Sequence, residues 1–473
     1  MHRRTLLPCL LCALLAGALL VPVGASAGRG AEVSVMDDPL LLGRSQGHID
    51  RQMRLFRRLG VDRVRVSAFW NGATATTANS TTRPANFNAA DPNDPRYSWS
   101  AVERVVDAAN RHGVRVMLSI TTPAPRWATF GGDPLRPRPT EFAAFAEAVA
   151  RRFGSRVDHY GAANEPNQPG WLLPQTDGGN LVSPHVYRAM LQLAYPRIKA
   201  ADPGSVVLAG NLASSGNDRP TPGKGIRPLR FLRAMACVDR KLRPIFGGRC
   251  ANFTPIPADA FGHHPYKFFG SPTRRSPKAD DAAIGDGRRL LRTLDRLQAR
   301  GRIVKTSRGR FKVFYTEFGY QTAPPDPFAG ISLRSHSRFL QQAAYLVWRT
   351  PRLNGLNQFR LTDGPLRRAR GLRRYAEFQS GLLFANRRKK PAYRSFADPF
   401  VIDGSRFWGQ VRPGGRHTVS LQHRRGATGR FRTVRRARTD NAGYFRVRLR
   451  RRKGQYRYVY QAPSGASDTL TIR

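Results

Sequence analysis

The sequence predicts a closed (β/α)8 barrel followed by a small antiparallel β-sandwich. A helix that ends at a glycine and is followed at once by a β-branched strand recurs along the first part of the chain. Near residue 399 the pattern changes to short alternating runs separated by turn clusters. The 473 residues leave room for one such barrel and one small domain. We expect a signal peptide over 1–27, the barrel over 28–398 and the β-sandwich over 399–473.

Three early segments carry the helix-to-strand pattern, as in "RLFRRLGVDRVRVSAFW". Their helices end at Gly60, Gly113 and Gly154, where glycine adopts the left-handed conformation at little cost. A helix followed by a strand, repeated, predicts a parallel sheet. Strands are expected near 33–37, 62–68, 114–121, 157–164, 206–211, 259–263, 312–317 and 354–361. Eight such units favour a closed barrel over an open doubly wound sheet, which usually has a glycine-rich first turn.

The C-terminal region alternates apolar and charged residues. Phe445, Val447 and Leu449 are separated by arginines, as in a strand with one buried face and one exposed face. Turn clusters such as "PGG" and "DNAG" divide the runs. The small β-sandwich either binds carbohydrate or an anionic cell-wall polymer, or is a structural appendage of the barrel.

The N-terminus begins with basic residues, continues with an apolar run and reaches Ala25-Ser26-Ala27, a small-residue cleavage site. This pattern predicts a secreted, extracellular protein, and the basic surface would allow it to associate with the cell wall. The alternative is an uncleaved anchor, because Leu6 to Val23 is nearly long enough to span a bilayer. No later segment is expected to enter a membrane. In an exported protein, Cys237 and Cys250 are expected to form one disulfide, and their spacing does not suggest a metal site.

The formal net charge of +49 comes mostly from scattered arginines. Such a chain binds polyanions through counterion release, unless the arginines only reflect a bias tolerated on a solvated surface. No RNA-recognition signature, zinc finger, P-loop or basic heptad accompanies the charge, so no specific nucleic-acid partner is expected.

Two glutamates follow the apolar cores of predicted strands. Glu165 closes the fourth strand in "YGAANEPNQPGW", and Glu317 closes the seventh in "KVFYTEFGYQT", 152 residues later. Because chemistry in such barrels lies at the C-terminal ends of the strands, both acids are expected to point into one mouth. The alternative for either acid is a structural ion pair.

The "NEP" and "TEFG" motifs resemble the retaining glycoside hydrolases of clan A, most nearly the cellulase-like family 5. The xylosidase-like family 39 is a close second, since "NEPN" suits it too. The resemblance covers roughly residues 31–398. It implies hydrolysis of O-glycosidic bonds in a polysaccharide or oligosaccharide by a double displacement, without a metal or an organic cofactor. Glu317 would be the nucleophile and Glu165 the general acid/base.

The resemblance also implies supporting residues. Asn164 would bind the sugar 2-OH, although it could be a turn asparagine. Arg65 would keep Glu317 ionised, unless it lies on the surface. In "FGHHPYKF", His264 would contact sugar hydroxyls and Tyr266 would hydrogen-bond the nucleophile. Two adjacent histidines on a strand point to opposite faces, so His263 is expected to pack in the core rather than share a metal with His264.

Aromatic side chains at a barrel mouth can stack on the apolar faces of sugars. Trp70, Trp127 and Trp171 are the candidates, followed by Tyr320, and each could instead be core packing. In the eighth strand, Gln358 takes the place of the tryptophan that the resemblance implies, which argues against plain cellulose as substrate.

Two other functions fit the same sequence. The first is a non-catalytic glycan-binding or cell-wall-binding protein built on the barrel. The second is a polyanion-binding protein that works through charge alone.

Overall fold

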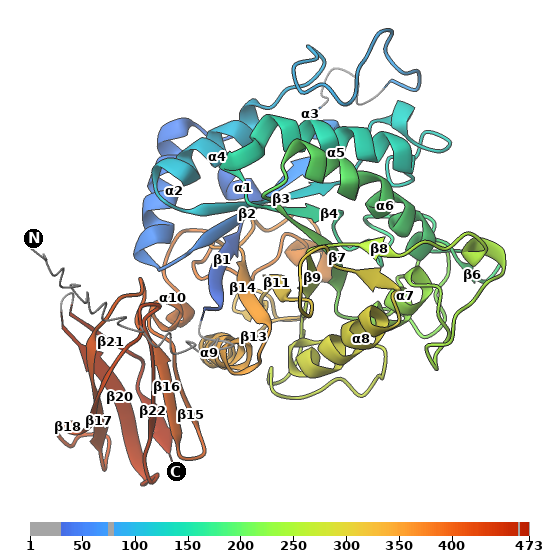
Figure 1. Ribbon diagram of the computed structural model, residues 1–473. Helices are drawn as coiled ribbons and strands as arrows, with labels where there is room; N and C mark the ends of the chain where they lie inside the picture. Colours follow the sequence, from blue (N-terminus) through green and yellow to red (C-terminus); the bar gives the residue numbers. More distant parts are fainter. Residues whose placement is uncertain (1–29, 74–79, 462–463, 473) are drawn as a thin grey trace, which may run out of the picture.

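A computed structural model describes residues 30–73, 80–461 and 464–472. The predicted signal peptide, residues 1–27, lies outside the described residues. Eight parallel strands close into a barrel in the order β1-β14-β11-β9-β7-β4-β3-β2 (Figure 1). Their bounds are β1 (Glu32–Met36), β2 (Arg63–Phe69), β3 (Arg115–Thr121), β4 (His159–Ala162), β7 (Val206–Ala213), β9 (Ala260–His264), β11 (Val313–Phe318) and β14 (Leu353–Phe359). The predicted fold class is confirmed, and each predicted barrel strand overlaps an observed one.

Each barrel strand is followed by a helix that covers the outside of the sheet. In chain order these are α2 (Gln46–Arg58), α4 (Ser100–Arg111), α5 (Pro139–Phe153), α6 (Ser183–Ala201), α7 (Pro228–Met235), α8 (Gly287–Ala299), α9 (Leu333–Arg349) and α10 (Pro391–Ala397). Gly60, Gly113 and Gly154 follow α2, α4 and α5 with positive φ angles, as predicted. No helix within the described residues is both long and apolar enough to cross a membrane.

Several loops of the barrel contain short helices or short pairs of strands. They are the helices α1 (Asp38–Leu41) and α3 (Trp70–Ala73), and the strand pairs β5 (Thr176–Asp177) with β6 (Asn180–Leu181), β8 (Ile256–Pro257) with β10 (Ile303–Val304), and β12 (Thr322–Ala323) with β13 (Ile331–Ser332). A disulfide joins Cys237, just after α7, to Cys250. It closes the short loop that the sequence predicted.

The C-terminal region forms two antiparallel sheets. One contains β15 (Phe400–Asp403), β16 (Arg406–Gln410) and β19 (Tyr444–Arg448). The other contains β17 (Thr418–Arg424), β18 (Arg432–Arg438), β20 (Gly454–Tyr460), β21 (Gly465–Ala466) and β22 (Leu470–Ile472). Phe407, Leu421, Phe445 and Tyr458 are among the residues of their common core. The arginine-rich strand β18 was not predicted as a strand, because its two apolar residues do not follow the apolar–polar alternation of a strand with one buried face.

The three-stranded sheet packs on helix α9 of the barrel (Figure 1). Trp408 and Tyr444 of the sheet contact Tyr345 and Trp348 of the helix, with ring centroids 5.4 to 6.2 Å apart. Gln341 of α9 also accepts a hydrogen bond from the backbone N–H of Phe400 at 2.8 Å. Aromatic packing and hydrogen bonds therefore attach the small domain to the barrel.

Alternate residues of β2 point into the barrel, and two of them are arginines. Arg63 lies near the N-terminal end, where it binds Glu32 at 2.7 Å and Asp158 at 2.9 Å. Arg65, two residues and about 6.8 Å further along, faces the other end of the barrel. Both side chains are almost fully buried. The barrel interior therefore contains one layer of buried charge at its base and another at its mouth.

The Arg63 layer generates a prediction about stability. The Arg63→Met variant should lose about 3 kcal/mol of unfolding free energy, because it leaves the largely buried Glu32 without its buried partner, while Asp158, whose side chain is 46% exposed, contributes less. Arg115 also binds Glu32, at 2.8 Å, but its side chain is 50% exposed. Arg115→Met should therefore cost less than about 1 kcal/mol. Urea denaturation of the full chain measures both, and equal losses in the two variants would contradict a structural role for the buried layer.

Candidate active site

The two predicted glutamates meet at the C-terminal ends of the barrel strands. Glu165 follows β4, Glu317 lies near the end of β11, and His264 ends β9. One carboxylate oxygen of each glutamate and a ring nitrogen of His264 all lie within 4.8 Å of one another. The Nδ1 atom of His264 lies 2.8 Å from Glu165 Oε1 and 3.7 Å from Glu317 Oε2. The fold therefore brings the two acids to one place.

The backbone that presents Glu165 is strained. Ala163 has φ 63° and Glu165 has φ 37°, both in the left-handed region that residues with a side chain rarely occupy. Asn211, on the neighbouring strand β7, has φ 49°. Each such residue costs on the order of 1–3 kcal/mol, so the surrounding contacts must hold this turn in place.

Asn211 makes most of those contacts, and the sequence analysis missed it. Its backbone carbonyl oxygen accepts a hydrogen bond from the N–H of Glu165 at 3.0 Å, and its side-chain Nδ2 donates to the backbone oxygen of Ala163 at 3.1 Å. Its Oδ1 accepts the hydroxyl hydrogen of Thr316, the residue before Glu317, at 3.0 Å. One buried amide therefore links the backbone of the first glutamate to the strand of the second. The only signal in the sequence is an amide within an apolar strand, in "LAGNLA".

Two glycines make room for this amide. A Cβ atom on Gly262 would lie 2.0 Å from Asn211 Oδ1, and one on Gly161 would lie 2.9 Å from its Nδ2. Strand β7 also shifts register between Gly210 and Leu212 where it pairs with β9. Such bulges often redirect a side chain beside an active site.

Glu317 receives a hydrogen bond on each carboxylate oxygen. Arg65 Nη1 donates to Oε2 at 2.9 Å, and the Tyr266 hydroxyl donates to Oε1 at 2.7 Å. Burial, followed by the nearby charge of Glu317, raises the pKa of Tyr266 well above its ordinary value, so the hydroxyl keeps its proton. Both donors bind the ionised form of the carboxylate.

Glu165 has a different environment. Burial raises its pKa to about 7, and the positive charge of Arg65 opposes that shift only in part. Burial also lowers the pKa of His264 to about 3, so this ring is neutral near pH 7. A neutral imidazole beside Glu165 leaves the raised pKa in place. The site therefore holds one carboxyl that can be protonated next to one that is bound as an anion.

The remaining predicted residues lie close by. Asn164 Oδ1 accepts a hydrogen bond from Arg65 Nη2 at 2.5 Å, and its Nδ2 makes no hydrogen bond with the described residues. His264 is fully buried and contacts Glu165, whereas the sequence analysis expected it to contact sugar hydroxyls. His263 points away from the site, and its Nε2 lies 2.5 Å from Ala282 O in the core.

Two of the predicted stacking platforms are wrong. Trp70 is 0% exposed because the chain turns into α3 directly after β2, and its ring stacks on Phe145 of α5. Trp127 is 7% exposed and packs edge-on against Trp70 and Phe87. Tyr320 is also buried, at 1%. Trp171 is partly exposed, and its role in sugar binding stays a prediction.

The position of Gln358 was also misjudged. Its side chain lies on the outer face of β14 beside Leu340 and Phe396, where it donates to the carbonyl of Ser380 at 2.8 Å. The next residue, Phe359, is partly exposed and lies 6.3 Å from the ring of Tyr266. Neighbouring residues on a strand face opposite sides, so Phe359 is the residue of this pair that faces the site.

Further aromatic rings surround Phe359 and Tyr266. Phe268 stacks on Tyr266 with centroids 5.8 Å apart, and Phe378 meets Phe359 edge-on at 5.2 Å. Phe268 is 53% exposed and Phe378 is 40% exposed. These rings, supplied by the loops after β9 and β14, form an aromatic rim next to the paired glutamates that sequence reasoning did not find.

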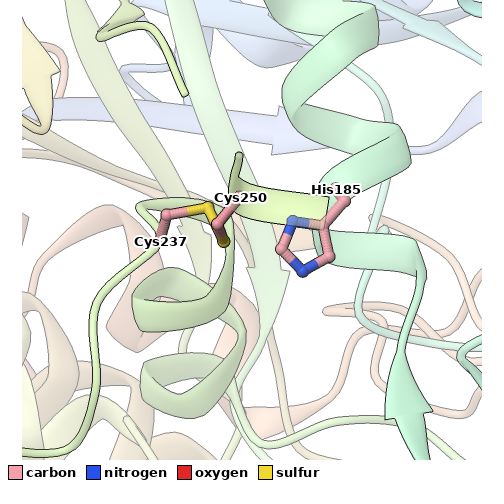
Figure 2. A group of neighbouring side chains, drawn as sticks. All are labelled: His185, Cys237 and Cys250. Atoms are coloured by element: carbon pink, nitrogen blue, oxygen red, sulfur yellow. A yellow bond between two sulfur atoms is a disulfide. The ribbon is translucent and has the colours of Figure 1, made fainter. Parts of the chain in front are cut away.

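Two side-chain groups among the described residues have ligand atoms close enough to hold a metal ion. In the first, Glu165, His264 and Glu317, the guanidinium of Arg65 already balances the negative charge at 2.9 Å. In the second, the His185 ring lies beside Cys237 and Cys250, whose sulfur atoms form the disulfide drawn in Figure 2. Disulfide sulfurs are not thiolates, and Arg188 lies 2.8 Å from Cys237 Sγ, so this group is unsuited to a cation.

Known proteins share this architecture. The model of the cellulase family, glycosyl hydrolase family 5, matches residues 28–226. A family 39 glycoside hydrolase from Bacteroides cellulosilyticus WH2 has a TM-score of 0.53 at 16% identity, over 89% of this chain and 80% of that one. GH5_18 from Streptomyces cattleya, in complex with GlcNAc, has a TM-score of 0.50 at 18% identity, over 78% and 79% of the two chains. No curated protein matches the chain in sequence.

At these identities the solved structures establish the fold, while the family match covers β1 to β7 and includes Glu165. The expected resemblance to clan A is confirmed. The match to the family 5 cellulase model over residues 28–226 identifies the chain as a glycosidase, and its (β/α)8 barrel is the fold of the clan A glycoside hydrolases that it resembles.

Proposed function

We propose that Glu317 is the nucleophile and Glu165 the general acid/base of a retaining glycosidase. The observation that carries this proposal is the separation of the two carboxylates, whose nearest oxygens lie within 4.8 Å. Retaining enzymes hold their carboxyl groups about 5–5.5 Å apart, whereas inverting enzymes need about 6.5–9.5 Å to admit a water molecule. The spacing therefore supports direct attack by a carboxylate.

The two environments divide the chemistry. Glu317 attacks the anomeric carbon while the protonated carboxyl of Glu165 gives its proton to the leaving oxygen. The covalent intermediate cancels the charge on Glu317, so Arg65 then acts on Glu165 without a competing carboxylate. This lowers the pKa of Glu165 and suits it to take a proton from the water that releases the sugar.

The surrounding residues support binding of a sugar chain. The free Nδ2 of Asn164 is the donor that we assign to the sugar 2-OH. Phe359 and the exposed rings of Phe268 and Phe378 offer stacking surfaces on one side of the glutamates, and Trp171 is a candidate on another. A row of rings suits a polysaccharide or a long oligosaccharide.

The loop between β14 and α10 favours an acidic polysaccharide. Residues 367–374 of this loop contain five arginines, and the next residue, Tyr375, packs against Phe328 at 6.0 Å. Arg367 pairs with Glu377. The other four are exposed and have no ion-pair partner among the described residues: Arg368, Arg370, Arg373 and Arg374. Guanidinium groups at this rim would bind carboxylates of the substrate.

We also infer that the protein is exported and acts at the cell wall. The first 27 residues have the pattern of a signal peptide, and the Cys237–Cys250 disulfide is typical of an oxidising environment. The basic surface would favour contact with an anionic wall polymer.

The roles of the glutamates can be tested with a panel of polysaccharides and aryl glycosides. The Glu317→Ala variant should lose at least about 10⁴-fold in kcat on any substrate that the wild type cleaves, since no nucleophile remains. A 2-deoxy-2-fluoro glycoside of that substrate should label Glu317, as mass spectrometry of the peptides would show. Glu147→Ala on α5 is the matched control and should keep full activity. Turnover in Glu317→Ala, or a wild type inactive on the whole panel, would favour the non-catalytic glycan-binding alternative.

The raised pKa of Glu165 predicts two pH effects. First, kcat/KM should fall above about pH 7, because the acid loses its proton there. Second, the folded state holds the proton of Glu165 more tightly than the unfolded chain does, so stability is lost as pH rises from about 4.5 to about 7. Glu165→Gln should therefore be more stable than the wild type at pH 8, by up to about 3 kcal/mol.

Denaturation at two pH values checks this second effect without any substrate. At pH 4 the carboxyl is protonated in both states, so wild type and Glu165→Gln should differ little. A constant difference between the variants from pH 4 to pH 8 would mean that the carboxyl titrates normally in the folded protein.

Asn211 should behave as a positioning residue. Asn211→Ala removes the side-chain link between the Glu165 turn and Thr316, so kcat should fall about 100-fold while KM changes little. Asn217→Ala is the control, because its amide binds only Gly225 O within its own loop. Steady-state kinetics separate the two parameters. A rise in KM at constant kcat would assign Asn211 to substrate binding instead.

A further inference from the structure

The small domain carries a strong imbalance of charge. Residues 400–473 contain seventeen arginines and one lysine, three aspartates and no glutamate. This excess is independent of the roles proposed for Glu165 and Glu317. It matters only if the few acids leave one part of the surface unneutralised.

The three aspartates are all engaged away from the outer face of the domain. Asp403 pairs with Arg349 of α9 at 3.1 Å. Asp468 accepts a hydrogen bond from Ser337 of α9 at 3.2 Å. Asp440 accepts the backbone N–H groups of Ala442 and Tyr444 and so closes a turn. Two of these acids therefore face the barrel, and none of them neutralises the β17–β18 hairpin.

The β17–β18 hairpin, residues 418–438, concentrates the unpaired charge. Strand β18 is the edge of its sheet, in the order β18-β17-β20-β21, and lies on the side of the domain away from the barrel (Figure 1). Six arginines of the hairpin are exposed and form no ion pair with the described residues: Arg425, Arg430, Arg432, Arg435, Arg436 and Arg438.

The hairpin presents these guanidinium groups on both faces. Arg436 and Arg438 lie opposite Ser420 and Thr418, on the outer side of the sheet. Arg435 lies opposite Leu421 of β17, whose side chain is buried in the core of the domain. Arg435 is itself exposed, so the three-stranded sheet that covers this face of β17 does not cover β18. Seven residues of strand give a charged ridge about 23 Å long.

The chemistry of the ridge fits a carboxylate polymer better than a nucleic acid. Guanidinium forks match the geometry of both carboxylates and phosphates, so the choice between the two rests on the other groups of the surface. Proteins that bind single-stranded nucleic acids usually add rings on which bases stack. The ring of Phe431 is already covered by Arg424, at 4.5 Å, and by Arg457, at 4.1 Å. No exposed aromatic ring is left on the hairpin.

We propose that the β17–β18 hairpin is a docking site for a polyanionic polysaccharide that carries a carboxylate on its repeating unit. The site holds the enzyme on the polymer and does not take part in the chemistry at the barrel mouth. Charges on an edge strand also prevent edge-to-edge pairing, a role that needs no ligand. Binding measurements separate the two roles.

The test compares full chains that all carry Glu317→Ala, so that no polymer is cleaved and a failure of the proposed catalysis does not affect the result. The hairpin variant replaces Arg432, Arg435, Arg436 and Arg438 by Gln. Its control replaces the same number of exposed, unpaired arginines along helix α8 and its C-terminal cap: Arg288, Arg292, Arg296 and Arg300. Titration calorimetry measures Kd between 50 and 200 mM NaCl for polygalacturonate, for duplex DNA as the phosphate polymer and for hydroxyethylcellulose as the neutral polymer.

The hairpin variant should bind polygalacturonate at least about tenfold more weakly than the parent, with a shallower dependence on salt, because fewer counterions are released. The α8 variant should stay within about twofold of the parent. Equal losses in both variants would show binding by overall charge, and no loss in either would leave only edge protection. Loss confined to duplex DNA would assign the hairpin to a nucleic acid. Any of these three results overturns the proposal.

Discussion

The arrangement of the mouth depends on one buried guanidinium. Arg65 donates to Glu317 on β11, to Asn164 after β4 and to Ser119 on β3, so it joins three strand ends around a single positive charge. A buried cation is costly without such partners, and a carboxylate without the cation would be costly too. The requirement to satisfy Arg65 therefore fixes where Glu317 lies, while burial raises the pKa of Glu165 and makes it a carboxyl that can hold a proton.

Position and protonation come from different parts of the structure. Arg65 and Tyr266 hold the carboxylate of Glu317 through hydrogen bonds, whereas burial raises the pKa of Glu165. The backbone strain at Ala163 and Glu165 is held by Asn211 and needs no charge. Because the two tasks use separate contacts, the two glutamates can lie close together while each keeps its own set of neighbours.

Much of the fold and the centre of the site could be predicted, because both follow from local periodicity. Three of the barrel strands follow helices that end at a glycine, and the others follow from the repeat of helical and apolar segments. Because strand ends in such a barrel converge, Glu165 and Glu317 could be paired. The aromatic residues were harder. Trp70 is at a strand end, but the chain turns into a helix there and buries the ring. At β14 an error of one residue exchanged Gln358 for Phe359, because neighbours on a strand face opposite sides. Asn211 escaped notice because its role depends on a bulge and on contacts between strands that are distant in sequence.

The arginines of this protein lie in three different electrostatic environments. At the base of the barrel, Arg63 is enclosed by two carboxylates, and at the mouth Arg65 is enclosed by one carboxylate and neutral acceptors. On β18, arginines have no acidic partner among the described residues and face water. The same side chain thus stabilises the fold where its charge is matched by carboxylates, lies beside the reacting groups where it is matched by Glu317, the proposed nucleophile, and is left for the external anion that we propose where it is unmatched. The formal net charge of +49 is the sum over all of these environments. The number of acidic side chains near each arginine, rather than the net charge of the chain, distinguishes the three roles.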